Sequence, residues 1–117
     1  MTNSAIVVLL CALAAPLASG CERKIDPKLQ SGADEIEKSI SLPNGSSPLN
    51  KYARYYTKET RDGRLVIHGQ FVAGMERPGR YFQTERRFVS DGGCSVIGVY
   101  LDVLTRRLSE PQCNGEA

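Results

Sequence analysis

The sequence predicts an α+β domain in which a short N-terminal helix precedes a four- to five-stranded antiparallel β-meander closed by one disulfide. Three observations predict this fold: apolar residues at helical spacing between positions 29 and 40, an Asp-Gly pair between two alternating segments, and two cysteines on either side of a second hairpin signal. With 41% hydrophobic and 24% charged residues, the composition is that of a small globular chain with one core.

A helix and a loop are predicted across residues 31–50, and the antiparallel β domain across residues 51–117. Ser31 is suited to cap the helix start, and Pro43-Asn44-Gly45 ends the helix because proline and glycine disfavour further helical turns. Residues 41–50 are loop by composition. The apolar face of this helix carries Leu29, Ala33, Ile36 and Ile40.

The β domain is predicted to open with a hairpin. Segments 53–60 and 65–73 flank Asp62-Gly63, and an Asp-Gly pair is the strongest short hairpin signal. In segment 65–73 the odd-numbered side chains are predicted to face the core, and the face that carries His68 is predicted to be partly exposed. A helix across residues 49–56 is the alternative to the first strand, but enrichment in tyrosine and threonine favours the strand.

Two further strands are predicted, over residues 81–89 and 94–102. The second of these is apolar on both faces, which is typical of a central strand. A type I turn is predicted at Asp102–Thr105, because aspartate and threonine favour its first and last positions. A hairpin with that turn places Cys94 opposite Cys113, within the distance that a disulfide requires.

The first twenty residues have the pattern of a secretory signal peptide. Residues 1–20 carry no charge, and the apolar run at 5–15 is too short to cross a membrane as a stable helix. Pro16 interrupts the run, and small residues follow in Leu17-Ala18-Ser19-Gly20-Cys21. This segment resembles the lipobox of bacterial lipoprotein precursors.

The resemblance implies that the mature chain begins at Cys21, whose thiol carries a diacylglyceryl group and whose amino group is acylated, with chains such as palmitate. Residues 21–30 are then a polar tether between the membrane and the domain. Glu22, in place of an aspartate, implies sorting to the outer membrane, where the domain faces the periplasm. The alternative is ordinary secretion of a soluble protein in which Cys21 is unmodified.

The four cysteines fit this interpretation. Cys11 leaves with the signal peptide and Cys21 is lipidated, so Cys94 and Cys113 remain as a pair in an oxidising compartment. A zinc site is the competing interpretation, but it needs three or four ligands and His68 is the only histidine. The sequence therefore predicts a disulfide, and neither a metal site nor a cofactor.

Charge and aromatic residues predict a binding face. Residues 51–107 carry eleven basic and six acidic side chains, which suits an acidic protein, a polysaccharide or anionic lipid. Nucleic acid is not an expected partner in the periplasm. Exposed aromatic and guanidinium groups stack on sugars and form protein contacts, although a half-buried strand shows the same alternation. The candidate binding face consists of Tyr52, Arg54, Tyr55, Tyr56 and Arg80.

No catalytic motif is present around the serines or cysteines, and the chain is predicted not to be an enzyme. The alternatives are a small hydrolase that uses His68 with a carboxylate, and a secreted inhibitor. In YARYYT, DGGCSV and the closing CNG the chain resembles small uncharacterised proteobacterial envelope lipoproteins. The predicted function is therefore a non-enzymatic, binding or structural role at the membrane surface.

Overall fold

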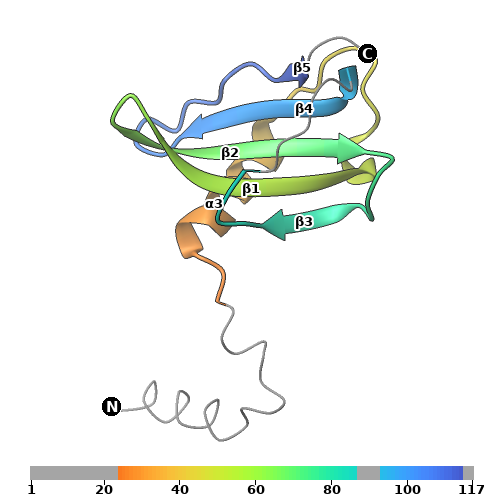
Figure 1. The fold of residues 1–117 in the computed structure, drawn as a ribbon. Coiled ribbons are helices and arrows are strands. Elements are labelled where there is room, and N and C mark those ends of the chain that lie inside the picture. The colour runs from red at the N-terminus through yellow and green to blue at the C-terminus, as the bar shows by residue number, and fades with distance from the viewer. Residues whose placement is uncertain (1–23, 87–92, 115–117) are drawn as a thin grey trace, which may run out of the picture.

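A computed structural model describes residues 24–86 and 93–114 of the chain. One helix packs against one face of a five-stranded sheet with strand order β3-β1-β2-β4-β5 (Figure 1). The α+β class is confirmed. The elements are α3 (Pro27–Ser39), the 3-10 turn η2 (Leu49–Lys51), β1 (Tyr52–Arg61), β2 (Arg64–Ala73), β3 (Gly79–Phe82), β4 (Gly93–Asp102) and β5 (Gln112–Asn114).

Helix α3 begins four residues before the predicted cap at Ser31. The side chain of Asp26 caps the helix by accepting a hydrogen bond from the backbone N–H of Lys28 at 2.9 Å. Pro27 occupies the first turn, where its missing N–H costs nothing. The helix approaches β2 closely at Gly32, because an added Cβ would lie 2.6 Å from Cγ1 of Ile67.

The predicted hairpin is confirmed as β1 and β2, which pair from Tyr52↔Ala73 to Arg61↔Arg64. Asp62 and Gly63 both have positive φ angles, of 52° and 76°, as the two central positions of a type I′ turn require. The alternative helix across residues 49–56 is wrong, and only η2 is helical there.

The prediction of an all-antiparallel meander is wrong, because β3 pairs with β1 in parallel, from Ala53↔Gly79 to Tyr56↔Phe82. Strand β4, whose side chains are apolar on both faces, pairs with the second edge of β2, and the short, half-buried β3 pairs with the outer edge of β1. The predicted third strand at 81–89 is also too long. It ends at Phe82, and residues 87–89 lie outside the described residues.

The disulfide between Cys94 and Cys113 is confirmed, with Cα atoms 4.5 Å apart, but the predicted register is wrong. The turn after β4 holds four residues, because the backbone N–H of Asp102 donates to the carbonyl of Arg107. The wider turn would misalign the cysteines. A register shift between Gly93 and Ile97 compensates for it and returns the two side chains to each other.

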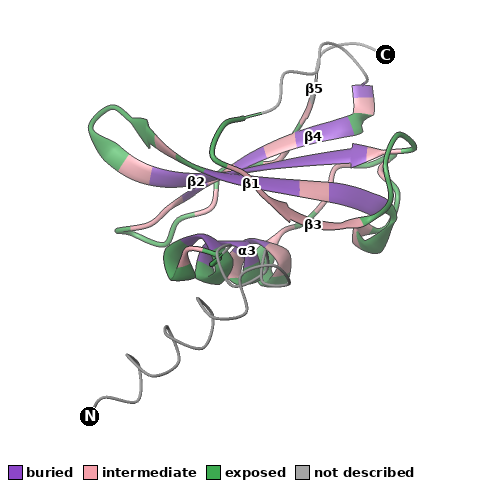
Figure 2. Ribbon diagram, turned by 60° about the horizontal axis from the view of Figure 1, so that its bottom comes forward, coloured by how far each residue is buried: buried purple, intermediate pink, exposed green. Residues whose placement is uncertain are grey.

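The sheet is buried on both faces. On the α3 face the core contains Tyr52, Tyr56, Phe71 and Ile97, with the helix beneath them (Figure 2). On the opposite face a second cluster contains Ala53, Tyr55, Val72 and Val96. The prediction that the His68 face is partly exposed is therefore wrong: His68 is 4% exposed, since β2 lies in the interior of the sheet.

Candidate functional site

The predicted binding face does not form an exposed cluster. Tyr52, Tyr55 and Tyr56 are all buried, because β1 lies between β2 and β3 and both of its faces are covered. Tyr52 and Tyr56 point toward α3, whereas Tyr55 points to the opposite face and stacks on Tyr81 with ring centroids 4.9 Å apart. The tyrosines are core residues, and the alternation reflects a strand that is buried on both sides.

The two arginines of the predicted face meet one carboxylate, that of Glu37 on α3. Arg54 Nε lies 3.0 Å from Glu37 Oε2, and Arg80 donates from Nε and Nη2 to the two oxygens at 2.9 and 3.1 Å. Arg80 also donates to Asp34 at 2.7 Å. We call Glu37, Arg54, Arg80 and Tyr56 the helix clasp, because together they join α3 to β1 and β3.

The hydroxyl of Tyr56 completes the helix clasp by donating to Glu37 Oε2 at 2.6 Å. Burial raises the pKa of Tyr56 above its ordinary value, and the adjacent carboxylate of Glu37 raises it further. The hydrogen bonds that Arg80 donates to Glu37 and Asp34 likewise raise the pKa of Arg80. Both shifts favour a neutral Tyr56 hydroxyl that donates to Glu37 and a charged Arg80 guanidinium that pairs with it.

A second polar cluster lies on the opposite face, and the sequence pattern did not predict it. Cross-strand pairing aligns Thr57, His68 and Tyr100 in one row across β1, β2 and β4. Arg86, beyond the end of β3, donates to both oxygens of Glu59 at 2.9 and 2.6 Å and to the hydroxyl of Tyr100 at 2.6 Å. We call Glu59, Arg86, His68, Tyr100 and Thr57 the histidine cluster.

The geometry of His68 does not suit a catalytic base. Its Nδ1 lies 4.0 Å from Glu59 Oε2, beyond hydrogen-bond distance, and the ring packs against Tyr100 with centroids 4.8 Å apart. Burial lowers the pKa of His68 to about 4, and the positive charge of Arg86 contributes to the shift. Arg86 also lowers the pKa of Glu59 through its hydrogen bonds. At neutral pH the cluster holds a neutral imidazole beside a neutralised carboxylate.

Sequence reasoning missed both glutamates because their partners come from distant segments. Neither Glu37 nor Glu59 stands in a motif, and they contact arginines 43 and 27 positions away. The only signal is the gathering of charged residues at positions 34–37 and 57–61, and this is the ordinary pattern of an exposed surface.

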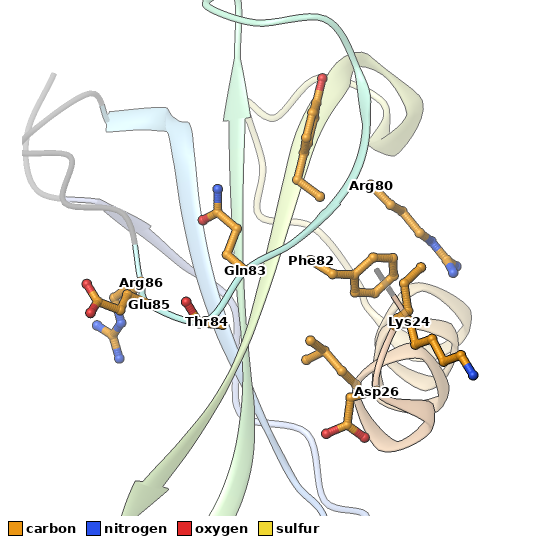
Figure 3. Close-up of a pocket in the computed structure, with 11 residues that line it drawn as sticks. Lys24, Asp26, Arg80, Phe82, Gln83, Thr84, Glu85 and Arg86 are labelled. Carbon is orange, nitrogen blue, oxygen red and sulfur yellow. The ribbon is translucent and has the colours of Figure 1, made fainter. Parts of the chain in front are cut away.

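An open groove of about 1030 Å³ separates the start of α3 from the segment that leaves β3 (Figure 3). Lys24, Asp26 and Phe82 lie on its helix side, whereas Glu85 and Arg86 lie beyond the strands. The groove was not predicted, because its lining comes from two segments that are distant in sequence, the tether with the start of α3 and the short β3 with the residues after it. It mixes apolar and charged side chains, and its long opening leaves most of them in contact with solvent.

Within residues 24–86 and 93–114, no three His, Cys, Asp or Glu side chains are grouped so that they could hold a metal ion. No helix in this part of the chain is long and apolar enough to cross a membrane. The predicted lipidation site, Cys21, lies outside the described residues. No protein-family model, curated protein or solved structure matches the chain.

Proposed function

We propose that the chain is a small lipid-anchored protein of the bacterial cell envelope, held on the outer membrane and facing the periplasm, with a binding or structural role and no catalytic activity. The observation that carries the proposal is the order of the first segments. An uncharged apolar run ends in Leu17-Ala18-Ser19-Gly20-Cys21, and charged residues begin directly after the cysteine.

The cysteine pairing supports a free thiol at position 21. Cys94 and Cys113 bond to each other, so neither competes for Cys21 in an oxidising compartment. A single acyl chain binds a membrane only weakly, whereas the three chains that the lipobox resemblance implies give stable anchoring. The five residues from Cys21 to the cap of α3 form a short connection between lipid and domain.

The polar clusters support a role other than catalysis. The helix clasp and the histidine cluster each neutralise their carboxylate with arginine, and each holds side chains from different elements together. Such pairing is the ordinary means by which buried charges are tolerated in a fold. The partner that fits this proposal is an envelope protein or a polysaccharide, bound elsewhere than on the buried tyrosines.

Intact mass spectrometry of the mature protein from membrane and soluble fractions tests the proposal. We expect a membrane form that begins at Cys21, is heavier by three acyl chains and a glyceryl group, and disappears in Cys21→Ser. A membrane fraction that contains the protein with an unmodified Cys21, or a wholly soluble protein of unmodified mass, would overturn the proposal and favour the secreted alternative.

A further inference from the structure

We propose that one end of the sheet docks on an anionic phospholipid surface, with an exposed leucine entering the headgroup layer. This end, the turn face, consists of the β1–β2 turn at residues 61–64 and the turn after β4 at residues 102–107. The inference rests on the proposed function, because it takes Cys21 as the point where the chain meets the bilayer.

The two turns of the turn face lie side by side although about forty residues separate them in sequence. Arg64 of the first turn pairs with Asp102 of the second at 2.8 Å. The backbone N–H of Val103 donates to the carbonyl of Leu65 at 3.1 Å, which extends the β2–β4 pairing into the turn. Both turns stand at the left edge of the sheet in Figure 1. They therefore form one continuous surface.

Leu104 projects from the tip of the turn face and is 82% exposed. The turn that carries it is well ordered by hydrogen bonds, because Asp102 Oδ1 accepts from the backbone N–H groups of Leu104 and Thr105 at 2.9 and 3.0 Å. A large apolar side chain held out into solvent by a rigid turn favours an apolar environment, such as the boundary between headgroups and acyl chains.

The turn face that carries this leucine is rich in arginine. The ten residues of the two turns contain four arginines and two aspartates, which is a local excess of positive charge. Arg64 and Arg106 are paired with Asp102 and Glu35, yet about half of each side chain remains exposed. Basic side chains around an apolar tip match the two layers of an anionic membrane, with phosphates outside and hydrocarbon beneath.

The tether leaves the domain near the same end. Lys58, three residues before the first turn, pairs with Asp26, which caps α3. Asp26 is five residues from Cys21, and a fully extended chain of five residues reaches at most about 18 Å. A lipid on Cys21 thus keeps Asp26 within roughly two screening lengths of the bilayer, since charges are screened over about 8–10 Å. This closeness favours lipid over an acidic protein as the occupant.

Tryptophan fluorescence tests the inference, because the chain contains no tryptophan. The mature lipoprotein with Leu104→Trp is reconstituted into phosphatidylcholine vesicles with or without phosphatidylglycerol, some with bromine on the acyl chains. We expect a blue shift and quenching by brominated lipid in anionic vesicles only, both reversed by high salt. Met75→Trp, 66% exposed at the other end of β2, is the matched control and keeps its water-like emission.

Charge-reversal variants identify the cause. In the Leu104→Trp protein, Arg61→Glu with Arg107→Glu is expected to reduce quenching in anionic vesicles at least threefold. Lys51→Glu with Arg77→Glu makes the same change of net charge away from the turn face and is expected to leave quenching unchanged. Circular dichroism confirms that both proteins are folded. Equal losses in the two proteins would overturn the inference, since net charge alone would then explain the attraction.

The outcomes distinguish this inference from the proposed function. A protein with the lipidated mass whose Leu104→Trp emission is the same in neutral and anionic vesicles overturns docking and leaves the anchor intact. A protein that is not lipidated overturns the anchor. The same reporter in the unlipidated Cys21→Ser chain, added to anionic vesicles, then decides docking by itself: a salt-sensitive shift supports the turn face, and unchanged emission overturns it.

Discussion

Each face of the sheet has one glutamate that pairs with arginine, but the two glutamates connect different elements of the fold. On the α3 face Glu37 binds Arg54, Arg80 and the Tyr56 hydroxyl, so the helix clasp joins a helix to two strands. On the other face Glu59 binds Arg86, so the histidine cluster joins neighbouring strands to the segment that follows β3. Interleaved tyrosine and arginine can therefore mark the interior of a two-sided sheet as well as a binding surface.

The two faces also differ in how they change the pKa values of their buried side chains. In the helix clasp burial raises the pKa of Tyr56 above its ordinary value, whereas in the histidine cluster burial and the charge of Arg86 lower the pKa of His68 to about 4. We therefore expect the first face to dominate stability and the second to make stability depend on pH.

The largest effect is expected from Glu37→Gln. This change removes a carboxylate that is only 16% exposed, so Arg54 loses its counter-charge and Arg80 keeps only the exposed Asp34. Breaking such a pair costs about 3 kcal/mol of unfolding free energy. Urea denaturation measures the loss. Asp34→Asn is the matched control, because Asp34 also binds Arg80 but is 65% exposed, and we expect less than about 1 kcal/mol there. Equal effects would show that apolar contacts alone hold the helix.

The next effect is pH dependence that arises from His68. Its pKa is lowered to about 4 in the folded protein, so the unfolded state binds more protons between that value and about 6.5. The contribution of neutral His68 to the free energy of unfolding has its full value above pH 6.5, and it is lost as the pH falls toward 4. We expect a loss of about 2 kcal/mol between pH 7 and pH 5. Urea denaturation at several pH values gives the free energy of unfolding as a function of pH. This free energy should change less with pH in His68→Gln than in the unmodified protein, and an equal change would contradict the assignment to His68.

Glu59→Gln is expected to cost about 1.5 kcal/mol, less than the equivalent change at Glu37. Its main partner, Arg86, is partly exposed, so water can replace the lost carboxylate. The comparison requires both variants to be measured in the same buffer at pH 7, where His68 is neutral in the folded state. A larger loss at Glu59 than at Glu37 would reverse our ranking of the two faces.

The smallest effect is expected from Gly32→Ala, at about 1 kcal/mol. The new Cβ meets Ile67 at 2.6 Å, and this overpacking exceeds the gain in helix propensity. An Ile67→Ala protein lacks Cγ1 and keeps only the Cβ at 3.3 Å, so the same change at position 32 should become neutral or stabilising. Thermal unfolding of the four proteins measures this coupling. Additive effects would show that α3 can move away from β2 without cost.

Local patterns in the sequence were sufficient for several elements. Asp62-Gly63 determined the first hairpin, because both positions need a positive φ that these residues tolerate. Apolar spacing identified the buried face of α3, although Asp26 and Pro27 moved its start. The chain's cysteine content determined which two residues pair in the domain.

The candidate site was the part that local patterns predicted least well. Whether Tyr55 or Tyr56 is exposed depends on how many layers cover β1, and a single strand carries no information about its coverage. The contact between Arg86 and Glu59 depends on the path that the chain takes after β3. The lipid anchor at Cys21 remains a prediction from sequence alone.

By itself the sequence determined the features that arise within a few residues: turn chemistry, helical periodicity and the disulfide partners. Only the tertiary structure decided that β3 runs parallel to β1, that both faces of the sheet are covered, and that a register shift between Gly93 and Ile97 aligns the cysteines. The physical reason is that a strand takes whichever edge leaves the least apolar surface and the fewest backbone groups unpaired. That choice depends on all five strands together.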